Sequence, residues 1–236
     1  MGRDFGPSEI ESVKEFADLF FKSRYYGRVR ALPDEEDLKT AAWLPGYTYW
    51  VAPSEMISDR DADGTAAWAP IPSPIDRNLI HCFERFLGAD LPPLFKCYLC
   101  SSSMLCADLT VGFLPQIDPR HPLSWLEWCL RARRHEPFMS SARYVPFAWG
   151  PATASYLWFD VESPTPDGDY PIIQTMDRSR HPEPASYRID RVFDSFGEYF
   201  EYLKLWMKFT ADGMPEHMCS WVEKNPLKHP PRPYFD

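Results

Sequence analysis

Y-V-P-F-A-W-G at residues 144–150, followed by S-Y-L-W-F-D-V at 155–161, opens the stretch of sequence that decides the fold. In the second segment the residues alternate with a period of two, which predicts a half-buried β-strand. One face would carry Leu157, Phe159 and Val161, and the other Tyr156, Trp158 and Asp160. The acidic segment P-T-P-D-G-D at 164–169 has turn chemistry in its Asp-Gly pair, so it predicts a hairpin to a second strand that starts near Pro171.

The segment F-D-S-F-G-E-Y-F-E-Y-L at 193–203 predicts a helix that closes this unit. Ser195 and Glu198 have the spacing of a capping box, which satisfies free N–H groups at a helix start. Apolar residues then recur in one helical stripe, formed by Phe196, Tyr199, Phe200, Leu203 and Met207. Such a stripe is typical of a helix that lies on a sheet.

Upstream, apolar spacing predicts four more helices, at about 9–26, 76–87, 91–99 and 123–134. The first would begin with a capping box formed by Ser8 and Glu11, and the second would end at Gly88. In the last, Leu123, Leu126 and Leu130 would face inward, and Arg131, Arg133 and Arg134 outward. Residues 28–74 look irregular, with short strands expected at 47–51 and 66–68, and the tail at 211–236 looks extended.

Composition limits the classes of protein to consider. The chain has 236 residues, 44% of them hydrophobic and 16% aromatic, which is enough for a sizeable core. It has 25 prolines and only 11 glycines, which disfavours a doubly wound α/β fold and glycine-rich phosphate loops. The net charge of −9 disfavours nucleic acid and anionic membranes as partners and favours a basic protein. No run reaches the roughly 18 apolar residues of a membrane span, and no secretory h-region opens the sequence, so a cytoplasmic location is expected.

Two segments suggest a metal or redox site. Cys97-x-x-Cys100, with Cys106 nearby, has no second C-x-x-C pair and no suitably spaced histidine pair, so buried free thiols are preferred over zinc or redox chemistry. The segment 59–64, D-R-D-A-D-G, matches the start of a calcium loop, but its twelfth position is Pro70 instead of a bidentate Glu. A solvated hairpin turn is preferred there, and a weak cation site stays open.

No catalytic motif is found in the sequence. The patterns G-x-S-x-G, H-E-x-x-H, the P-loop and G-x-G-x-x-G are all absent. His217 with Cys219 could form a nucleophile pair, but incidental proximity is the preferred interpretation. Asp160 with Glu162 could form a pair of catalytic carboxylates, but a solvated acidic edge is preferred. The sequence therefore predicts no catalytic residues, metal or cofactor, while a site assembled from distant residues stays open.

The order of these segments resembles the SMI1/KNR4 family of the SUKH superfamily of bacterial immunity proteins. Three segments carry the resemblance: F-E-R-F-L-G-A-D-L-P-P-L-F-K-C-Y-L at 83–99, the strand pair at 145–173, and the closing helix at 193–203. The resemblance implies an α+β domain with a strongly curved, mainly antiparallel sheet backed by helices. A single domain over 1–236 is expected, with its core at about 76–210, an N-terminal helical extension at 1–75 and an extended tail at 211–236.

The resemblance also implies a function that needs no catalysis. Such proteins bind and neutralise a cognate polymorphic toxin, often a nuclease or deaminase, made by the same cell. We expect the partner-binding surface to include exposed aromatics ringed by carboxylates, namely Tyr156, Trp158, Asp160, Glu162, Asp167 and Asp169. The alternative that stays open is that Trp158 packs under a neighbouring loop. A general protein-binding scaffold or regulatory module of the same fold remains an alternative, as does an enzyme of unrecognised type.

Overall fold

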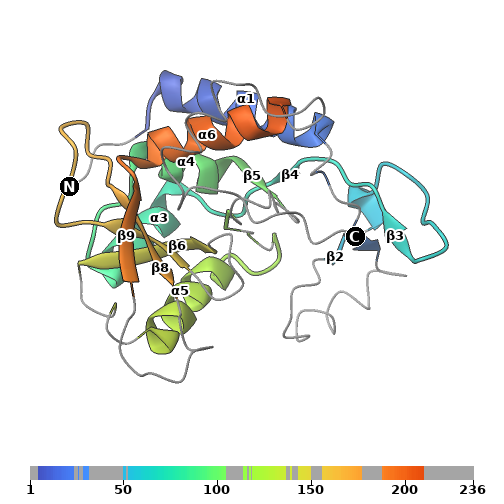
Figure 1. The fold of residues 1–236 in the computed structure, drawn as a ribbon. Helices are drawn as coiled ribbons and strands as arrows, with labels where there is room; N and C mark the ends of the chain where they lie inside the picture. Colours follow the sequence, from blue (N-terminus) through green and yellow to red (C-terminus); the bar gives the residue numbers. More distant parts are fainter. Residues whose placement is uncertain are drawn as a thin grey trace.

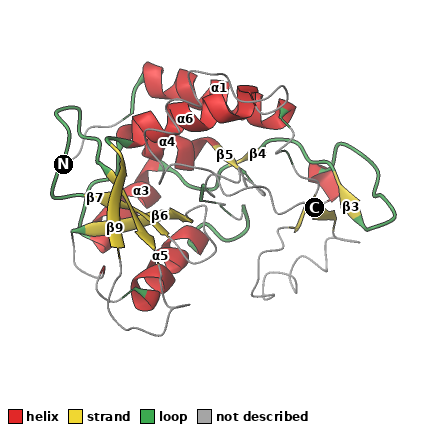
Figure 2. Ribbon diagram, viewed as in Figure 1, coloured by secondary structure: helices red, strands yellow, loops and turns green. Residues whose placement is uncertain are grey.

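The computed structural model describes residues 5–23, 26, 29–31, 50–51, 53–104, 114–115, 117, 119–136, 139, 143–149, 156–176 and 188–209. Its α-helices there are α1 (Pro7–Lys22), α3 (Arg77–Leu87), α4 (Pro93–Ser101), α5 (Ser124–His135) and α6 (Phe196–Phe209) (Figure 1). The described part of the chain mixes helices with mainly antiparallel strands, as the sequence predicts (Figure 2). Within these residues no helix is both long and apolar enough to cross a membrane.

The principal sheet has four antiparallel strands in the order β6-β7-β8-β9. They are β6 (Tyr144–Trp149), β7 (Tyr156–Asp160), β8 (Ile172–Met176) and β9 (Arg188–Phe193). The predicted hairpin is present, because Phe159 of β7 pairs with Ile172 of β8, directly after Pro171. The register between β6 and β7 shifts between Pro146 and Ala148, which indicates a β-bulge.

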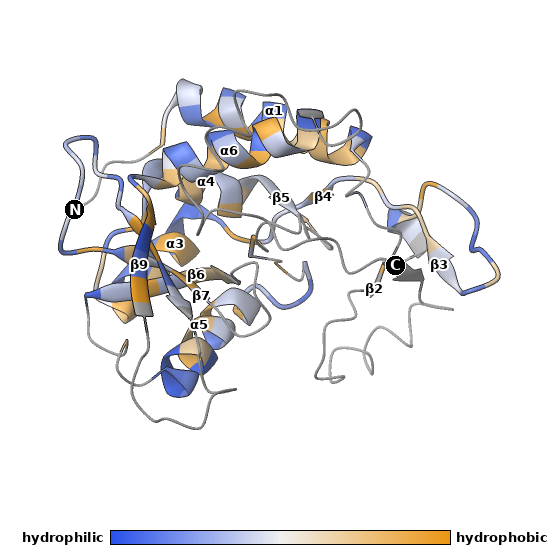
Figure 3. Ribbon diagram, viewed as in Figure 1, coloured by the Kyte–Doolittle hydropathy of each residue, from blue (hydrophilic) through white to orange (hydrophobic). Residues whose placement is uncertain are grey.

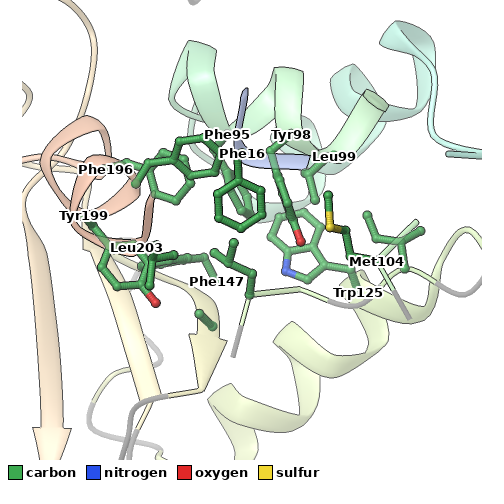
Figure 4. Packing of buried hydrophobic residues seen from close by; sticks show 14 of the residues in the cluster. Phe16, Phe95, Tyr98, Leu99, Met104, Trp125, Phe147, Phe196, Tyr199 and Leu203 are labelled. Carbon is green, nitrogen blue, oxygen red and sulfur yellow. The ribbon is translucent and has the colours of Figure 1, made fainter. Parts of the chain in front are cut away.

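One face of this sheet packs on the main core. Leu157 and Phe159 of β7 belong to the same buried cluster as residues of α4 and α6. The rings of Phe147 and Phe159 stack with centroids 4.2 Å apart, and Phe95 of α4 and Phe196 of α6 meet them edge-on. Figure 4 shows this aromatic core, to which Phe16 of α1 also contributes. Aromatic pairs in these geometries stabilise a core by about 0.5–1.5 kcal/mol each beyond the burial of their area.

The other face of the sheet is covered by α5. Tyr156, Trp158 and Ile173 form a second buried cluster with Ala132 of α5, and Trp128 packs against it. The two faces of β7 are therefore the two that the alternation predicts, but the half-buried prediction is wrong, since all five residues of the strand are buried. Helix α5 was expected to face inward through its leucines, but Trp125, Cys129 and Ala132 are its buried residues.

Helix α1 lies beside α6 in the outer layer (Figure 1). Hydrophobic and hydrophilic residues alternate along both helices (Figure 3), and the ring of Phe16 stacks on Phe200 with centroids 4.6 Å apart. Lys204 of α6, itself buried, donates to Glu15 Oε2 of α1 at 2.8 Å. The N-terminal helix, placed by the sequence in an extension, thus contributes Val13, Phe16 and Phe20 to the main core.

The helix boundaries partly follow the sequence. Asp76 caps α3 by accepting from the Leu79 N–H at 2.8 Å, and Gly88 ends it with a φ of 76°. Helix α1 begins earlier than predicted, with Gly6 as its N-cap: the Gly6 N–H donates to Glu9 Oε2 at 2.9 Å, so Ser8 and Glu11 are not the capping pair. Proline at the first helical position favours this start.

The remaining strands are short. They are β1 (Val29–Ala31), β2 (Trp50–Val51), β3 (Thr65–Ala66), β4 (Ile71–Pro72) and β5 (Ser102–Ser103). β1 pairs in parallel with β2 and antiparallel with β3, and β4 pairs antiparallel with β5. The predicted strand at 47–51 is seen only at its last two residues; positions 47–49 lie outside the described residues, as does the predicted tail at 211–236.

Candidate partner-binding surface

Residues 160–169, called here the acidic turn, run from the last residue of β7 toward β8 and project at the left of Figure 1. Thr165 organises the turn. Its N–H donates to Asp169 O at 2.8 Å, its carbonyl accepts from the Gly168 N–H at 3.0 Å, and its hydroxyl accepts from the Asp169 N–H at 3.1 Å. Gly168 has a φ of 77°, a conformation that glycine adopts without steric cost. The turn therefore has a defined conformation of its own.

At the start of the turn, Asp160 forms a two-pronged ion pair with Arg143. Arg143 Nε donates to Asp160 Oδ1 at 3.1 Å, and Nη2 donates to Oδ2 at 3.0 Å. These hydrogen bonds raise the pKa of the Arg143 guanidinium further above its usual range. Asp160 is buried, whereas Glu162, which lies 3.5 Å from Arg143 Nη1, has a side chain that is 63% exposed. Asp160 is thus a structural group, and Glu162 is available to a partner.

At the end of the turn, Asp169 points inward to the start of α6. Its Oδ1 accepts from the Phe196 N–H at 3.1 Å and the Tyr170 N–H at 2.7 Å, and its Oδ2 accepts from the Gly197 N–H at 2.9 Å. Burial raises the pKa of the Asp169 carboxyl above its usual value, although the three N–H donors act in the opposite direction. The carboxylate that was predicted to contact a partner is therefore half-buried and bonded to main-chain N–H groups of the protein itself.

Because Asp169 bonds to Phe196 and Gly197, the acidic turn lies against the first residues of α6. These residues add two more carboxylates. The Asp194 side chain is 83% exposed and pairs with Arg191 at 3.0 Å, and Glu198 accepts from the Asp194 N–H at 2.7 Å. We call Glu162, Asp167, Asp194 and Glu198 the acidic surface. Asp167 is exposed at the tip of the turn.

The two aromatic residues predicted at this surface are not there. Trp158 is 0% exposed and Tyr156 is 8% exposed, because α5 covers their face of the sheet. Trp158 Nε1 donates to Thr175 Oγ1 at 3.3 Å, and Thr175 in turn donates to Glu136 Oε1 at 2.9 Å. The prediction of exposed aromatic anchors is therefore wrong for both residues, which instead tie α5 to the sheet.

The structure thus divides the predicted site residues into two groups. Glu162 and Asp167 face solvent, while Tyr156, Trp158, Asp160 and Asp169 stabilise the fold. Sequence reasoning missed Arg143, Asp194 and Glu198. The pairing of β6 with β7 brings Arg143 to Asp160. The pairing of β8 with β9, together with the contact of the turn with α6, brings Asp194 and Glu198 to the turn.

The other candidate sites in the sequence have structural roles. In the turn at 59–64, Asp61 accepts from the Thr65 N–H at 2.8 Å and from the Asp63 N–H at 3.1 Å, so the predicted hairpin turn is present. Among the described residues no group of three or more His, Cys, Asp or Glu side chains is placed to hold a metal ion.

The cysteines of the described segments are free thiols. Cys97 is buried, which raises the pKa of its thiol to about 11, and Cys100 is half-buried. Burial favours the neutral thiol, which is neither the nucleophilic nor the metal-binding form. The prediction of a buried thiol therefore holds for Cys97, while Cys106, His217 and Cys219 lie outside the described residues.

A buried ion pair closes the junction between α3 and α4. Lys96 Nζ donates to Glu84 Oε1 at 3.1 Å, and the Leu91 N–H donates to the same oxygen at 2.9 Å. His81 Nδ1 lies 3.2 Å from Glu84 Oε2. The carboxylate thus has partners on both oxygens, which identifies it as part of the fold.

Comparison with known proteins adds no assignment: no family model matches the chain, and no curated protein matches it at a significant level.

Proposed function

We propose that this protein is a non-catalytic immunity protein of the SMI1/KNR4 type, which binds and neutralises a basic toxin domain in the cytoplasm of the bacterium that makes both. The proposal starts from the sequence resemblance. Its three segments correspond to α3 with α4, to the β6–β7–β8 part of the sheet, and to α6. We further propose that this four-stranded sheet with its helices is the curved sheet of a SUKH domain.

The observation that carries the proposal is the acidic surface, two of whose four residues lie on a preorganised turn. Glu162 and Asp167 are exposed, and the turn that bears them is fixed by the three hydrogen bonds of Thr165. A surface that is ordered before binding loses little conformational entropy on association. Clustered carboxylates attract a basic domain over long range, which speeds association and makes it sensitive to salt. An inhibitor of a toxin made in the same cell needs such rapid capture.

The test is co-expression with the toxin domain encoded beside this gene, scored by growth and by co-purification. We expect rescue of growth and a stoichiometric complex. Failure of rescue, with no complex at low salt, would refute the immunity function and favour the general scaffold.

A pair of charge reversals locates the interface. Asp167→Lys removes a carboxylate from the acidic surface, and Asp18→Lys makes the same change in charge at an exposed position of α1. We expect Asp167→Lys to slow association by about tenfold at low salt and Asp18→Lys to have little effect. Equal association rates for the two variants would show that the turn is not the interface.

A further inference from the structure

We infer that Asp169 is a positioning residue of the partner-binding surface: it fixes the acidic turn to the start of α6 and does not itself touch the partner. The inference rests on the proposed function, and it concerns how that surface is presented. Among the predicted site residues in the described part of the turn, only Asp169 has a carboxylate that accepts from main-chain N–H groups of another element. These N–H groups belong to the start of α6.

Asp169 completes the cap of α6 from outside the helix, because it accepts from N–H groups that have no partner within the helix. The helix has its own cap, because Ser195 Oγ accepts from the Glu198 N–H at 3.0 Å and Glu198 Oε2 accepts from the Asp194 N–H at 2.7 Å. Asp169 satisfies two further N–H groups at this helix start, from 27 and 28 positions away along the chain. These bonds extend the connection between the two segments beyond the pairing of Ile172 with Phe193, where β8 and β9 meet.

The consequence is a fixed relation between two sets of carboxylates. Asp167 lies two residues before Asp169 and Asp194 two residues before Phe196, so the Asp169–Phe196 bond links the segments that carry the two side chains. On the inner side, Thr165 Oγ1 accepts from the Asp169 N–H, so the same residue is anchored to the turn through its backbone and to α6 through its side chain. Without the side-chain bonds of Asp169, the carboxylates of the acidic surface would remain, but those of the turn could move relative to those of α6.

Three variants separate positioning from direct contact. Asp169→Asn and Asp167→Asn each remove one negative charge, but only the first replaces one of the two acceptor oxygens used by α6 with an NH2 donor. Ser195→Ala weakens the start of α6 without touching the turn, so it is the control for a general loss of helix stability. Amide hydrogen exchange, followed by NMR on the chain alone, reports whether the turn is released.

We expect exchange at Gly168, Phe196 and Gly197 to be at least about tenfold faster in Asp169→Asn and unchanged in Asp167→Asn, because charge-assisted bonds are lost only in the first. With the neighbouring toxin domain, Asp169→Asn should mainly raise the dissociation rate. Asp167→Asn should mainly lower the association rate and its salt dependence. Ser195→Ala should change neither rate.

Unchanged exchange in Asp169→Asn would overturn the inference, and so would faster exchange with an unchanged dissociation rate. If Asp169→Asn does not fold, Thr165→Val is the milder variant, because it removes only the hydrogen bond from the Asp169 N–H. Thr165→Val should also raise the dissociation rate. An unchanged dissociation rate would count against the inference. If the wild-type chain binds no such toxin, the proposed function falls and the positioning role falls with it. The exchange data distinguish this case, because they need no partner.

Discussion

Replacing Lys96 by Met would leave the carboxylate of Glu84 buried without its cation. Lys96 is 3% exposed and Glu84 8% exposed, and Nζ lies 3.1 Å from Oε1. At that distance, with an effective dielectric constant of about 20, the attraction between the two charges is about 5 kcal/mol. Removing one partner of a buried pair typically costs about 3–5 kcal/mol, and we expect a loss of that size for Lys96→Met. This is a large part of the roughly 5–15 kcal/mol that stabilises an ordinary domain.

The double variant Glu84→Gln with Lys96→Met tests the reason for that loss. The introduced glutamine side chain is uncharged but can still accept from the Leu91 N–H, which Glu84 binds at 2.9 Å. We therefore expect the double variant to lie within about 1–2 kcal/mol of the wild type, although each single variant is much less stable. The assay is urea unfolding at neutral pH with the m-value checked for constancy. A loss below about 1 kcal/mol for Lys96→Met, or additive losses in the double variant, would refute the argument.

Three further predictions test other parts of the structure. Tyr199→Phe should leave the free energy of unfolding unchanged or raise it by about 1 kcal/mol, because the Tyr199 hydroxyl is buried without a hydrogen-bond partner among the described residues; a clear loss in urea unfolding would contradict this. Gly168→Ala should lower the free energy of unfolding by about 1–2 kcal/mol through the positive φ alone, since an added Cβ meets nothing within 4 Å. Gly168→Asn should lower the free energy of unfolding less, because asparagine adopts a positive φ more readily than alanine. Lys204 and Lys208 lower the pKa of Glu15 from its ordinary value of 4.5 to about 2. The ionised Glu15 therefore stabilises the fold at pH values above 4.5, and this contribution is lost as the pH falls from 4.5 to about 2. Glu15→Gln should reduce the acid-induced loss of stability over that range, and identical pH profiles for the two proteins would contradict the assignment.

Much of the fold could be predicted because it depends on local patterns. The alternation in β7 correctly assigns Leu157 and Phe159 to one face and Trp158 to the other. The capping pair of Ser195 and Glu198 marks the start of α6, and Asp76 with Gly88 bounds α3. In each case the residues that determine the structure lie within one turn or one strand.

The errors arise where a distant element decides the outcome. Nothing near Trp158 in the sequence indicates that α5 covers it, so the alternation predicts a half-buried strand where the structure has one buried on both faces. In α5 the leucine stripe and the stripe of Trp125, Cys129 and Ala132 are both helical, and only packing selects the second. Likewise, an acidic residue such as Asp169 cannot be told from an exposed one until α6 is placed beside it.

The contact between α1 and α6 also has a consequence for synthesis of the chain. Ser12 and Glu201 are bonded across 189 positions, and Phe16 of the first helix stacks on Phe200 of the last one described. At translation rates of roughly 5–20 residues per second, α1 waits about 10–40 s for α6, which is one of the helices it packs on. During that interval the apolar side of α1, with Val13, Phe16 and Phe20, lacks its α6 neighbour. Until α6 is made, this part of the apolar side of α1 is therefore available for aggregation or for chaperone binding.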